Sequence, residues 1–276
     1  MLKRADELIQ ESHARSNSAA HSAGLADVPG AAAQSFAGCS FSYTSTAGAE
    51  FLRKLEAYRE FSINLVLVGE PGTHFQHICE AFIGVSNSGS ERLVWLRPTD
   101  FDLEPLLTRL LAFEDEPVDK ISLIMRDVTE ISGDRKSILF RLSRREAPFN
   151  RLPVEVRFLY CLEETPESLY DRGAIDEDLF VFIGSLEIRV PSLRECREDI
   201  PAFARYILEE SKVGGSEVEA PVLAEDSSEF IASYEWPGNY EELKRTLLAA
   251  VDSSTGPEIT LNDISRHLKV GESDHA

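Results

Sequence analysis

The sequence has few cysteines and no clustered metal ligands, and this shortage excludes two classes of protein. Its 276 residues contain four cysteines that lie far apart in the chain, namely Cys39, Cys79, Cys161 and Cys196. Without a CxxC pair or a Cys/His set at zinc-ligand spacing, neither a disulfide scaffold nor a zinc site is expected. His74 and His77 have HxxH spacing, but no further ligand set accompanies them, so we expect no bound metal.

Long apolar runs and positive charge are also scarce. No run approaches the roughly 20 residues that span a bilayer, and residues 1–9 lack the apolar core of a secretory signal, so we expect a cytoplasmic protein without membrane contact. Lys and Arg number 28 against 48 Asp and Glu, which gives a net charge of -20. Since nucleic-acid binding depends on Lys and Arg neutralising phosphates, direct DNA binding is not expected. We interpret the densest basic stretch, residues 135–145, as a solvated helix face.

What the sequence does contain is organised into four segments. Residues 1–47 are rich in Ser, Ala and Gly and poor in large apolar side chains. They bury too little surface to offset the entropy of ordering, so we predict a disordered arm. An α/β domain is expected over 48–196, a small helical domain over 197–270 and a disordered tail over 271–276.

Strand-like apolar runs alternate with helical patterns in the α/β segment. The five expected strands cover residues 63–68, 93–96, 121–125, 154–160 and 186–190. The expected helices cover residues 49–61, 75–82, 103–112 and 135–145. This alternation predicts a parallel five-stranded sheet with flanking helices.

From Arg197 onward the strand-like runs stop. Helical patterns at 199–210, 224–234, 239–251 and 261–268 predict a helical domain. Asn239, which follows Pro237 and Gly238, is expected to cap the third of these helices.

A glycine-containing turn over residues 69–76 joins the first expected strand to a helix, which is the layout of a phosphate-binding loop. Against the pattern GxxxxGK[ST], Gly69 matches the first glycine, whereas His74 and Phe75 stand at the second glycine and the lysine. Hydrogen bonds to charged groups are worth roughly 1.5–3 kcal/mol. Loss of the lysine should therefore weaken nucleotide binding about ten- to a hundredfold.

Four stretches, in the same order, resemble the AAA+ domain of bacterial sigma-54-dependent transcription activators. Residues 236–243 (WPGNYEEL) resemble the lid motif WPGNVREL, and residues 189–200 (RVPSLRECREDI) resemble RLPPLRER-x-EDI. Residues 69–73 (GEPGT) resemble the loop GESGTGKE, and residues 258–264 (EITLNDI) resemble the ending PIT-x-x-DL. The resemblance implies a P-loop NTPase-like sheet followed by an AAA+ lid.

The departures from that family fall at its catalytic positions. Arg126 stands where the family has the Asp that serves Mg²⁺. Asp127 stands where the family has the Glu that orients the attacking water. Asp176 and Phe182 stand at the arginine fingers, which are typically worth roughly 10³–10⁵ in rate. Glu241 replaces the lid arginine that senses the γ-phosphate. We expect Arg126 and Asp127 to form an ordinary ion pair at the strand end.

The resemblance therefore implies a degenerate nucleotide site without catalytic residues. Its expected members are Gly69, Glu70, Gly72, Thr73, His74, Phe75, Gln76, Arg126, Asp127 and Glu241. No ATPase activity and no cofactor are expected, and ATP or ADP should bind only weakly. The GAFTGA loop that grips the sigma factor has no counterpart between residues 82 and 123.

Retained fold with altered chemistry predicts a regulatory protein-interaction module in transcription regulation. Its partner would be a protein, either an active AAA+ activator or another AAA+ subunit. Two alternatives stay open. One is a nucleotide-binding switch that does not hydrolyse ATP, in which the turn still cradles phosphates at a helix N-terminus. The other is an enzyme of another kind that uses His74, His77, Asp127 and Glu241.

Overall fold

A computed structural model describes residues 34–35, 42–59, 61–84, 91–184, 186–211, 221–254, 256 and 258–268. These residues form two compact units. The first, here called the sheet unit, contains the described residues of 51–69 and 75–190. The second, the lid unit, contains those of 32–50, 70–74 and 191–276. Among the described residues, no helix is long and apolar enough to cross a membrane.

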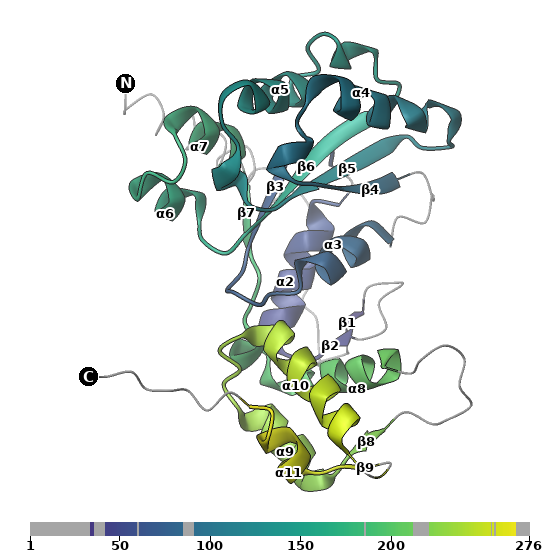
Figure 1. The fold of residues 1–276 in the computed structure, drawn as a ribbon, viewed down its shortest axis with the longest axis vertical. Coiled ribbons are helices and arrows are strands. Elements are labelled where there is room, and N and C mark those ends of the chain that lie inside the picture. The colour runs from purple at the N-terminus through teal and green to yellow at the C-terminus, as the bar shows by residue number, and fades with distance from the viewer. Residues whose placement is uncertain are drawn as a thin grey trace, which may run out of the picture. The chain divides into compact units, whose positions relative to one another are not determined.

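The sheet unit is built on five parallel strands (Figure 1). In spatial order they are β4 (Glu91–Leu96), β5 (Lys120–Met125), β6 (Glu155–Leu162), β3 (Leu65–Val68) and β7 (Glu187–Arg189). Parallel neighbours require crossover connections, and the helices between the strands provide them. The predicted parallel five-stranded sheet with flanking helices is confirmed.

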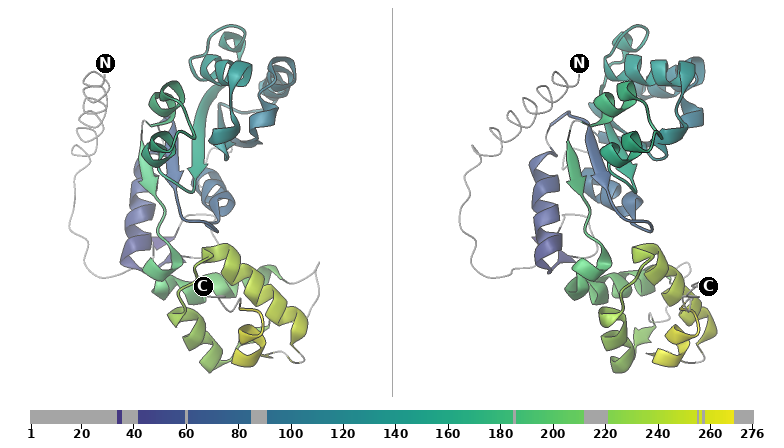
Figure 2. Two further views of the ribbon diagram at one scale, coloured as in Figure 1. Left: turned by 60° about the vertical axis from the view of Figure 1, so that its left-hand side comes forward. Right: turned by 90° about the vertical axis from the view of Figure 1, so that its left-hand side faces the viewer.

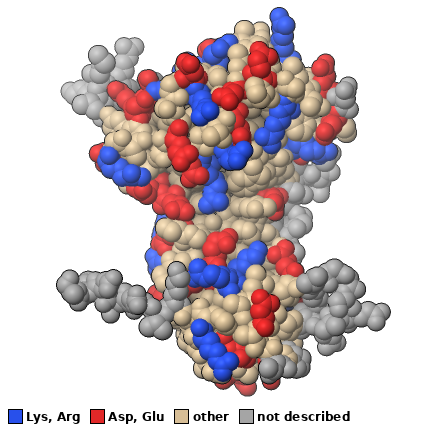
Figure 3. Space-filling view, in the orientation of Figure 1, with Lys and Arg blue, Asp and Glu red and all other residues tan. Residues whose placement is uncertain are grey.

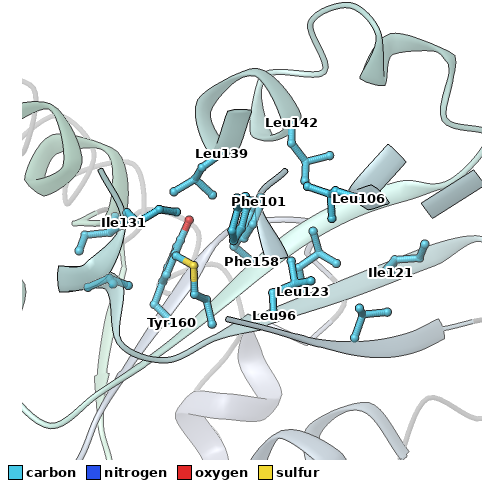
Figure 4. Close-up of a cluster of buried hydrophobic side chains, with 14 of the residues drawn as sticks. Leu96, Phe101, Leu106, Ile121, Leu123, Ile131, Leu139, Leu142, Phe158 and Tyr160 are labelled. Atoms are coloured by element: carbon cyan, nitrogen blue, oxygen red, sulfur yellow. The ribbon is translucent and has the colours of Figure 1, made fainter. Parts of the chain in front are cut away.

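Helices cover both faces of this sheet (Figures 1 and 2). One face packs on α4 (Leu103–Leu111), α5 (Gly133–Ser143), α6 (Pro166–Asp171) and α7 (Glu177–Ile183). Figure 4 shows this core, where Leu123, Phe158 and Tyr160 of successive strands meet Phe101 and Leu139. The other face carries α3 (Phe75–Gly84) and the sheet-unit part of α2 (Thr46–Ala57). Short 3₁₀ turns lie at Pro98–Asp100, Ala112–Asp115, Val128–Glu130 and Phe149–Arg151.

A buried ion pair lies within the sheet unit. The Arg157 side chain is 0% exposed, and its Nη2 lies 2.6 Å from Oε1 of Glu91. Its Nε donates to Ser122 Oγ at 2.7 Å, and its Nη1 donates to the carbonyls of Arg59 and Phe61 at 2.9 and 3.1 Å. Buried charges are tolerated only when they are paired and hydrogen-bonded, and these acceptors meet that requirement.

The lid unit is mainly helical, as predicted. It contains α8 (Ile200–Glu210), α9 (Glu225–Ser233), α10 (Asn239–Ser253) and α11 (Leu261–Ser265), with 3₁₀ turns at Leu193–Glu195 and Arg197–Asp199. Its core is centred on Trp236, which is fully buried and whose Nε1 donates to the Ile231 carbonyl at 2.7 Å.

The expectation that strands stop at Arg197 is wrong. β8 (Val222–Leu223) pairs in parallel with β9 (Glu258–Ile259). Two-residue strands are too short to show any periodicity, so the sequence pattern did not indicate them.

The predicted boundaries differ from the structure at the N-terminal side. Within the stretch expected to be a disordered arm, β1 (Gln34–Ser35) pairs with β2 (Ser42–Tyr43), and α2 begins at Thr46. The Tyr43 ring meets Phe203 of the lid core edge-to-face at 5.5 Å, which explains why this stretch is ordered. The remainder of residues 1–47 and the predicted tail over 271–276 lie outside the described residues.

Candidate nucleotide site

The ten predicted site residues fall into two sets, one in each unit. The sheet unit holds Gly69, Phe75, Gln76, Arg126 and Asp127. The lid unit holds Glu70, Gly72, Thr73, His74 and Glu241.

Phe75, the residue that the sequence pattern predicts at the position of the phosphate-binding lysine, is a core residue. It begins α3 and is 1% exposed. The Cζ atom of Arg126 lies 5.8 Å from the centroid of its ring, which is within the range of a cation–π contact. The expected ion pair between Arg126 and Asp127 is absent from these described residues, since Arg126 packs over the ring instead. An apolar side chain and an exposed cation therefore stand side by side here.

Three other sheet-unit residues serve local structure. The Gly69 N–H donates to the Leu162 carbonyl at 3.0 Å and so continues the sheet. Gln76 Nε2 donates to Glu80 at 2.8 Å along α3. Asp127 has φ +56°, and its carbonyl accepts from the Glu130 N–H at 3.1 Å, which starts a 3₁₀ turn.

Asp176 and Phe182, the two residues predicted to stand at the arginine-finger positions, also have structural contacts. Asp176 caps α7 by accepting from the Leu179 N–H at 3.0 Å, and it forms an ion pair with Lys136. The hydrogen bond from Lys136 holds the pKa of Asp176 below its ordinary value. Phe182 packs against Phe140, with ring centroids 4.6 Å apart. Neither position presents a cation.

In the lid unit, residues 70–73 form a tight turn. Pro71 and Gly72 are its central residues, Gly72 has φ +82°, and the Thr73 N–H donates to the Glu70 carbonyl at 3.1 Å. This is the pattern of a type II turn, which favours Pro and then Gly at these two positions. Thr73 Oγ1 donates to the same carbonyl at 2.7 Å, so both donors of Thr73 are used inside the turn.

The turn is fastened to the start of α10. Asn239 Nδ2 donates to the Pro71 carbonyl at 3.0 Å, and the Glu241 N–H donates to the Gly72 carbonyl at 3.1 Å. A Cβ added to Gly72 would lie 2.0 Å from the Gly238 carbonyl oxygen. The backbone approach is therefore close enough that only glycine is accommodated.

Asn239 does not have the capping role expected of it. Gly238 is the N-cap of α10, and its N–H donates to Glu242 at 2.7 Å. Asn239 instead uses its Oδ1 to accept from the Leu193 N–H at 3.1 Å while its amide holds the turn. Its φ of +47° places it in the left-handed region, which asparagine tolerates better than most residues.

Two side-chain contacts complete the lid part of the site. Glu70 forms a bidentate ion pair with Arg194, whose hydrogen bonds lower the pKa of Glu70. The His74 ring stacks on Tyr240 with centroids 4.5 Å apart and an interplanar angle of 13°. Burial raises the pKa of Tyr240 above its ordinary value. The Glu241 side chain itself is exposed.

Sequence reasoning did not predict that Arg194, Asn239 and Tyr240 hold the turn. All three lie in the stretches that resemble family motifs, and this was the available signal. Among the described residues, no group of three or more His, Cys, Asp or Glu side chains could hold a metal ion.

Known proteins with this arrangement define the class of the fold. A family model for the AAA+ ATPase lid domain matches residues 194–276. NtrX from Brucella abortus in complex with ADP aligns with a TM-score of 0.61 at 17% identity, covering 80% of this chain and 53% of NtrX. A single-residue variant of RuvB from Thermotoga maritima aligns with a TM-score of 0.56 at 11% identity, covering 81% of this chain and 68% of RuvB. The fold is therefore the P-loop AAA+ fold with its lid.

Proteins related in amino-acid sequence define the class more narrowly than the structural matches do. The DNA-binding transcriptional regulator NtrC of Escherichia coli (strain K12) is 28% identical over 160 residues, which is 55% of this chain and 34% of NtrC. The Nif-specific regulatory protein of Azotobacter vinelandii is 29% identical over 156 residues, 54% of this chain and 29% of that protein. The matched region thus covers about a third of these relatives. The chain carries an AAA+ domain related to sigma-54 activators, as its motifs predicted.

Proposed function

We propose that this chain is a non-hydrolysing AAA+ domain that acts as a regulatory protein-interaction module in transcription control. The observation that carries the proposal is the burial of Phe75 at the lysine position, with Arg126 against its ring. A buried ring offers the phosphates neither a charge nor a hydrogen-bond donor. A neighbouring guanidinium disfavours Mg²⁺, the ion that bridges the β- and γ-phosphates in working members of the fold.

The rest of the loop supports the same conclusion. Phosphate loops bind through backbone N–H groups that point at the ligand. Here the N–H groups of Gly69 and Thr73 donate to the Leu162 and Glu70 carbonyls. The residues present therefore do not fit a magnesium-nucleotide site, and we derive no hydrolytic step for this chain.

The packing of the lid unit supports a role in protein binding, because such a role needs the folded surface and no phosphate chemistry. Trp236 keeps its core position, and Asn239 and Arg194 keep the turn on α10. A fold maintained without phosphate chemistry is consistent with selection for what its surface binds. Relatedness to regulators such as NtrC supports transcription as the setting. The partner we propose is a protein, either an active AAA+ activator or another AAA+ subunit.

Calorimetric titration with Mg-ATP and Mg-ADP, together with an ATPase assay on the same sample, tests the first half of the proposal. We expect no binding tighter than about 1 mM and no hydrolysis. The variant Arg126→Asp tests whether the cation opposes Mg²⁺, and Arg53→Asp on the exposed face of α2 is its charge-matched control. Micromolar binding without turnover would favour the switch alternative, and turnover would refute the proposal.

The second half concerns the partner. The chain should change the ATPase rate of a purified NtrC-type activator from the same cells when titrated to about 100 µM, because useful interactions are tighter than that. An unchanged rate, with no complex in analytical ultracentrifugation, would remove the AAA+ partner while leaving the loss of hydrolysis intact.

A further inference from the structure

The α6–α7 segment, residues 163–183, has an unusual surface. It contains seven Asp and Glu residues and a single basic residue, Arg172. Acidic side chains gather over α6 and α7 on the face drawn in Figure 3. Six of the seven, all but Glu164, are exposed.

Apolar side chains lie among these carboxylates. Val181 is 57% exposed and Tyr170 is 37% exposed, so both present apolar surface beside the carboxylates. The Tyr170 ring stacks on Phe180 with centroids 5.0 Å apart, and Val181 follows Phe180 in α7. Glu177 and Asp178 precede Val181 by four and three residues, so they share its helix face. We call Tyr170, Phe180 and Val181 the apolar strip, and we call Glu177 and Asp178 its acidic border.

Only part of this negative charge is neutralised within the molecule. Lys136 pairs with Asp176 and lies 3.8 Å from Asp178, and Arg172 pairs with Glu164 at 2.9 Å. Among the residues that the structure describes, Glu167, Asp171 and Glu177 take part in no ion pair. The field of Glu167 adds to burial in raising the pKa of Glu187 on β7.

We propose that the α6–α7 segment docks a basic amphipathic helix of a partner protein. The apolar strip would bury apolar side chains of that helix, and its Lys and Arg residues would pair with the acidic border, so charge and polarity match together. Helices offer no free strand edge, so recognition must come from side chains. This inference rests on the interaction role proposed above and names the chemistry of the partner.

A second copy of this chain is a poor occupant of the surface. Each copy carries a net charge of -20, and the seven carboxylates of one segment would meet another acidic protein. Like charges brought together across an interface oppose association, whereas a basic partner relieves the repulsion.

The test is a fluorescence anisotropy titration of the full chain with a labelled 18-residue helix of Leu and Lys. Val181→Ser should weaken binding about three- to tenfold through lost apolar burial. The double variant Glu177→Gln/Asp178→Asn should weaken binding and reduce its salt dependence.

The chain offers a matched control for each variant. Val222→Ser removes a valine that is 65% exposed in the lid unit. Glu225→Gln/Asp226→Asn removes a Glu–Asp pair from the first two positions of α9, just as Glu177→Gln/Asp178→Asn does in α7. Both controls should bind like the wild type, and a Leu/Glu helix should not bind.

Equal losses in the α6–α7 variants and their controls would overturn the proposal, because binding would then reflect net charge alone. Absence of saturable binding would also overturn it, as would a dimer that Val181→Ser alone dissociates. The nucleotide titration is independent of these outcomes, so the two proposals can fail separately.

Discussion

Each unit contains an arginine that holds a carboxylate, and water reaches the two pairs very differently. The Arg157 and Glu91 side chains are 0% and 6% exposed. Those of Arg194 and Glu70 are 38% and 33% exposed. The sheet unit therefore buries the charge of Arg157 in its interior. In the lid unit, the charge of Arg194 lies at the surface, where it stabilises the turn that begins at Glu70.

The difference teaches which contacts the fold depends on. A buried charge left without its partner has no water to compensate it, so breaking such a pair typically costs about 3–5 kcal/mol. At a surface, water and salt replace much of the lost attraction. The lid fastening must accordingly depend on its backbone geometry and amide contacts more than on its ion pair.

Arg157→Met should produce the largest effect. It removes the guanidinium that pairs with the Glu91 carboxylate and donates to the carbonyls of Arg59 and Phe61, and only the neutral Ser122 hydroxyl still donates to that carboxylate among the contacts described. The sheet unit should therefore lose about 3–5 kcal/mol of stability in urea unfolding. Arg92→Met, which breaks the half-exposed pair with Glu116, is the control and should cost less than about 1 kcal/mol. If both variants lost a similar free energy of unfolding, the buried pair would contribute no more to stability than the exposed pair, and the prediction would be wrong.

Gly72→Ala should come next. The added Cβ meets the Gly238 carbonyl oxygen at 2.0 Å, in addition to the strain of φ +82°. Gly173→Ala isolates the strain, since Gly173 has φ +70° and nothing within 4 Å of its added Cβ. We expect roughly 1–2 kcal/mol for the control and a clearly larger loss for Gly72→Ala. Hydrogen exchange should show the Glu241 amide opening in Gly72→Ala only, and equal exchange in both variants would contradict the close approach.

Asn239→Ala should cost about 1–3 kcal/mol, because the buried Leu193 N–H loses its acceptor. Asn239→Gly removes the same hydrogen bonds but suits the left-handed backbone. The glycine variant should therefore be the more stable of the two in thermal unfolding. The reverse order would mean that the backbone at this position relaxes freely.

The smallest effect should follow from Arg194→Ala and should depend on pH. Because the folded-state pKa of Glu70 lies below the ordinary value of 4.5, its stabilisation is fully present above that value. It is lost as the pH falls through the lowered pKa. Carboxyl NMR titration should show the pKa of Glu70 rising in Arg194→Ala, while Arg197→Ala, a neighbour paired with Glu235, should leave it unchanged. An unshifted Glu70 pKa would show that Asn239 alone holds the carboxylate.

Features with a repeating pattern could be predicted from the sequence. The apolar runs over 63–68, 121–125 and 154–160 correspond to β3, β5 and β6, and the pattern over 239–251 corresponds to α10. The AAA+ class followed from motifs. These features are local, because each arises from neighbouring residues that share one face or one turn.

Contacts between distant polar groups could not be predicted in this way. Asn239 reaches Pro71 across 168 residues, and no periodicity records such a pairing. The sequence pattern predicted Phe75 at the lysine position of the loop, but it did not predict that Arg126 packs over the Phe75 ring. The ion pair expected between Arg126 and Asp127 is not found: β5 ends at Met125, Asp127 adopts a left-handed backbone that starts a 3₁₀ turn, and Arg126 packs over the Phe75 ring.

The division of the chain has a consequence for how the lid is inherited. A family model for the lid domain matches residues 194–276, yet the physical lid also includes the described residues of 32–50 and 70–74. Asp199 is 0% exposed and accepts hydrogen bonds from the N–H groups of Thr44 and Ser45. A gene fragment that encoded only the matched residues would leave this carboxylate without those donors. The residues that the family model matches are therefore not a complete structural unit. Recombination could exchange the lid unit only together with the start of α2 and the turn over residues 70–73.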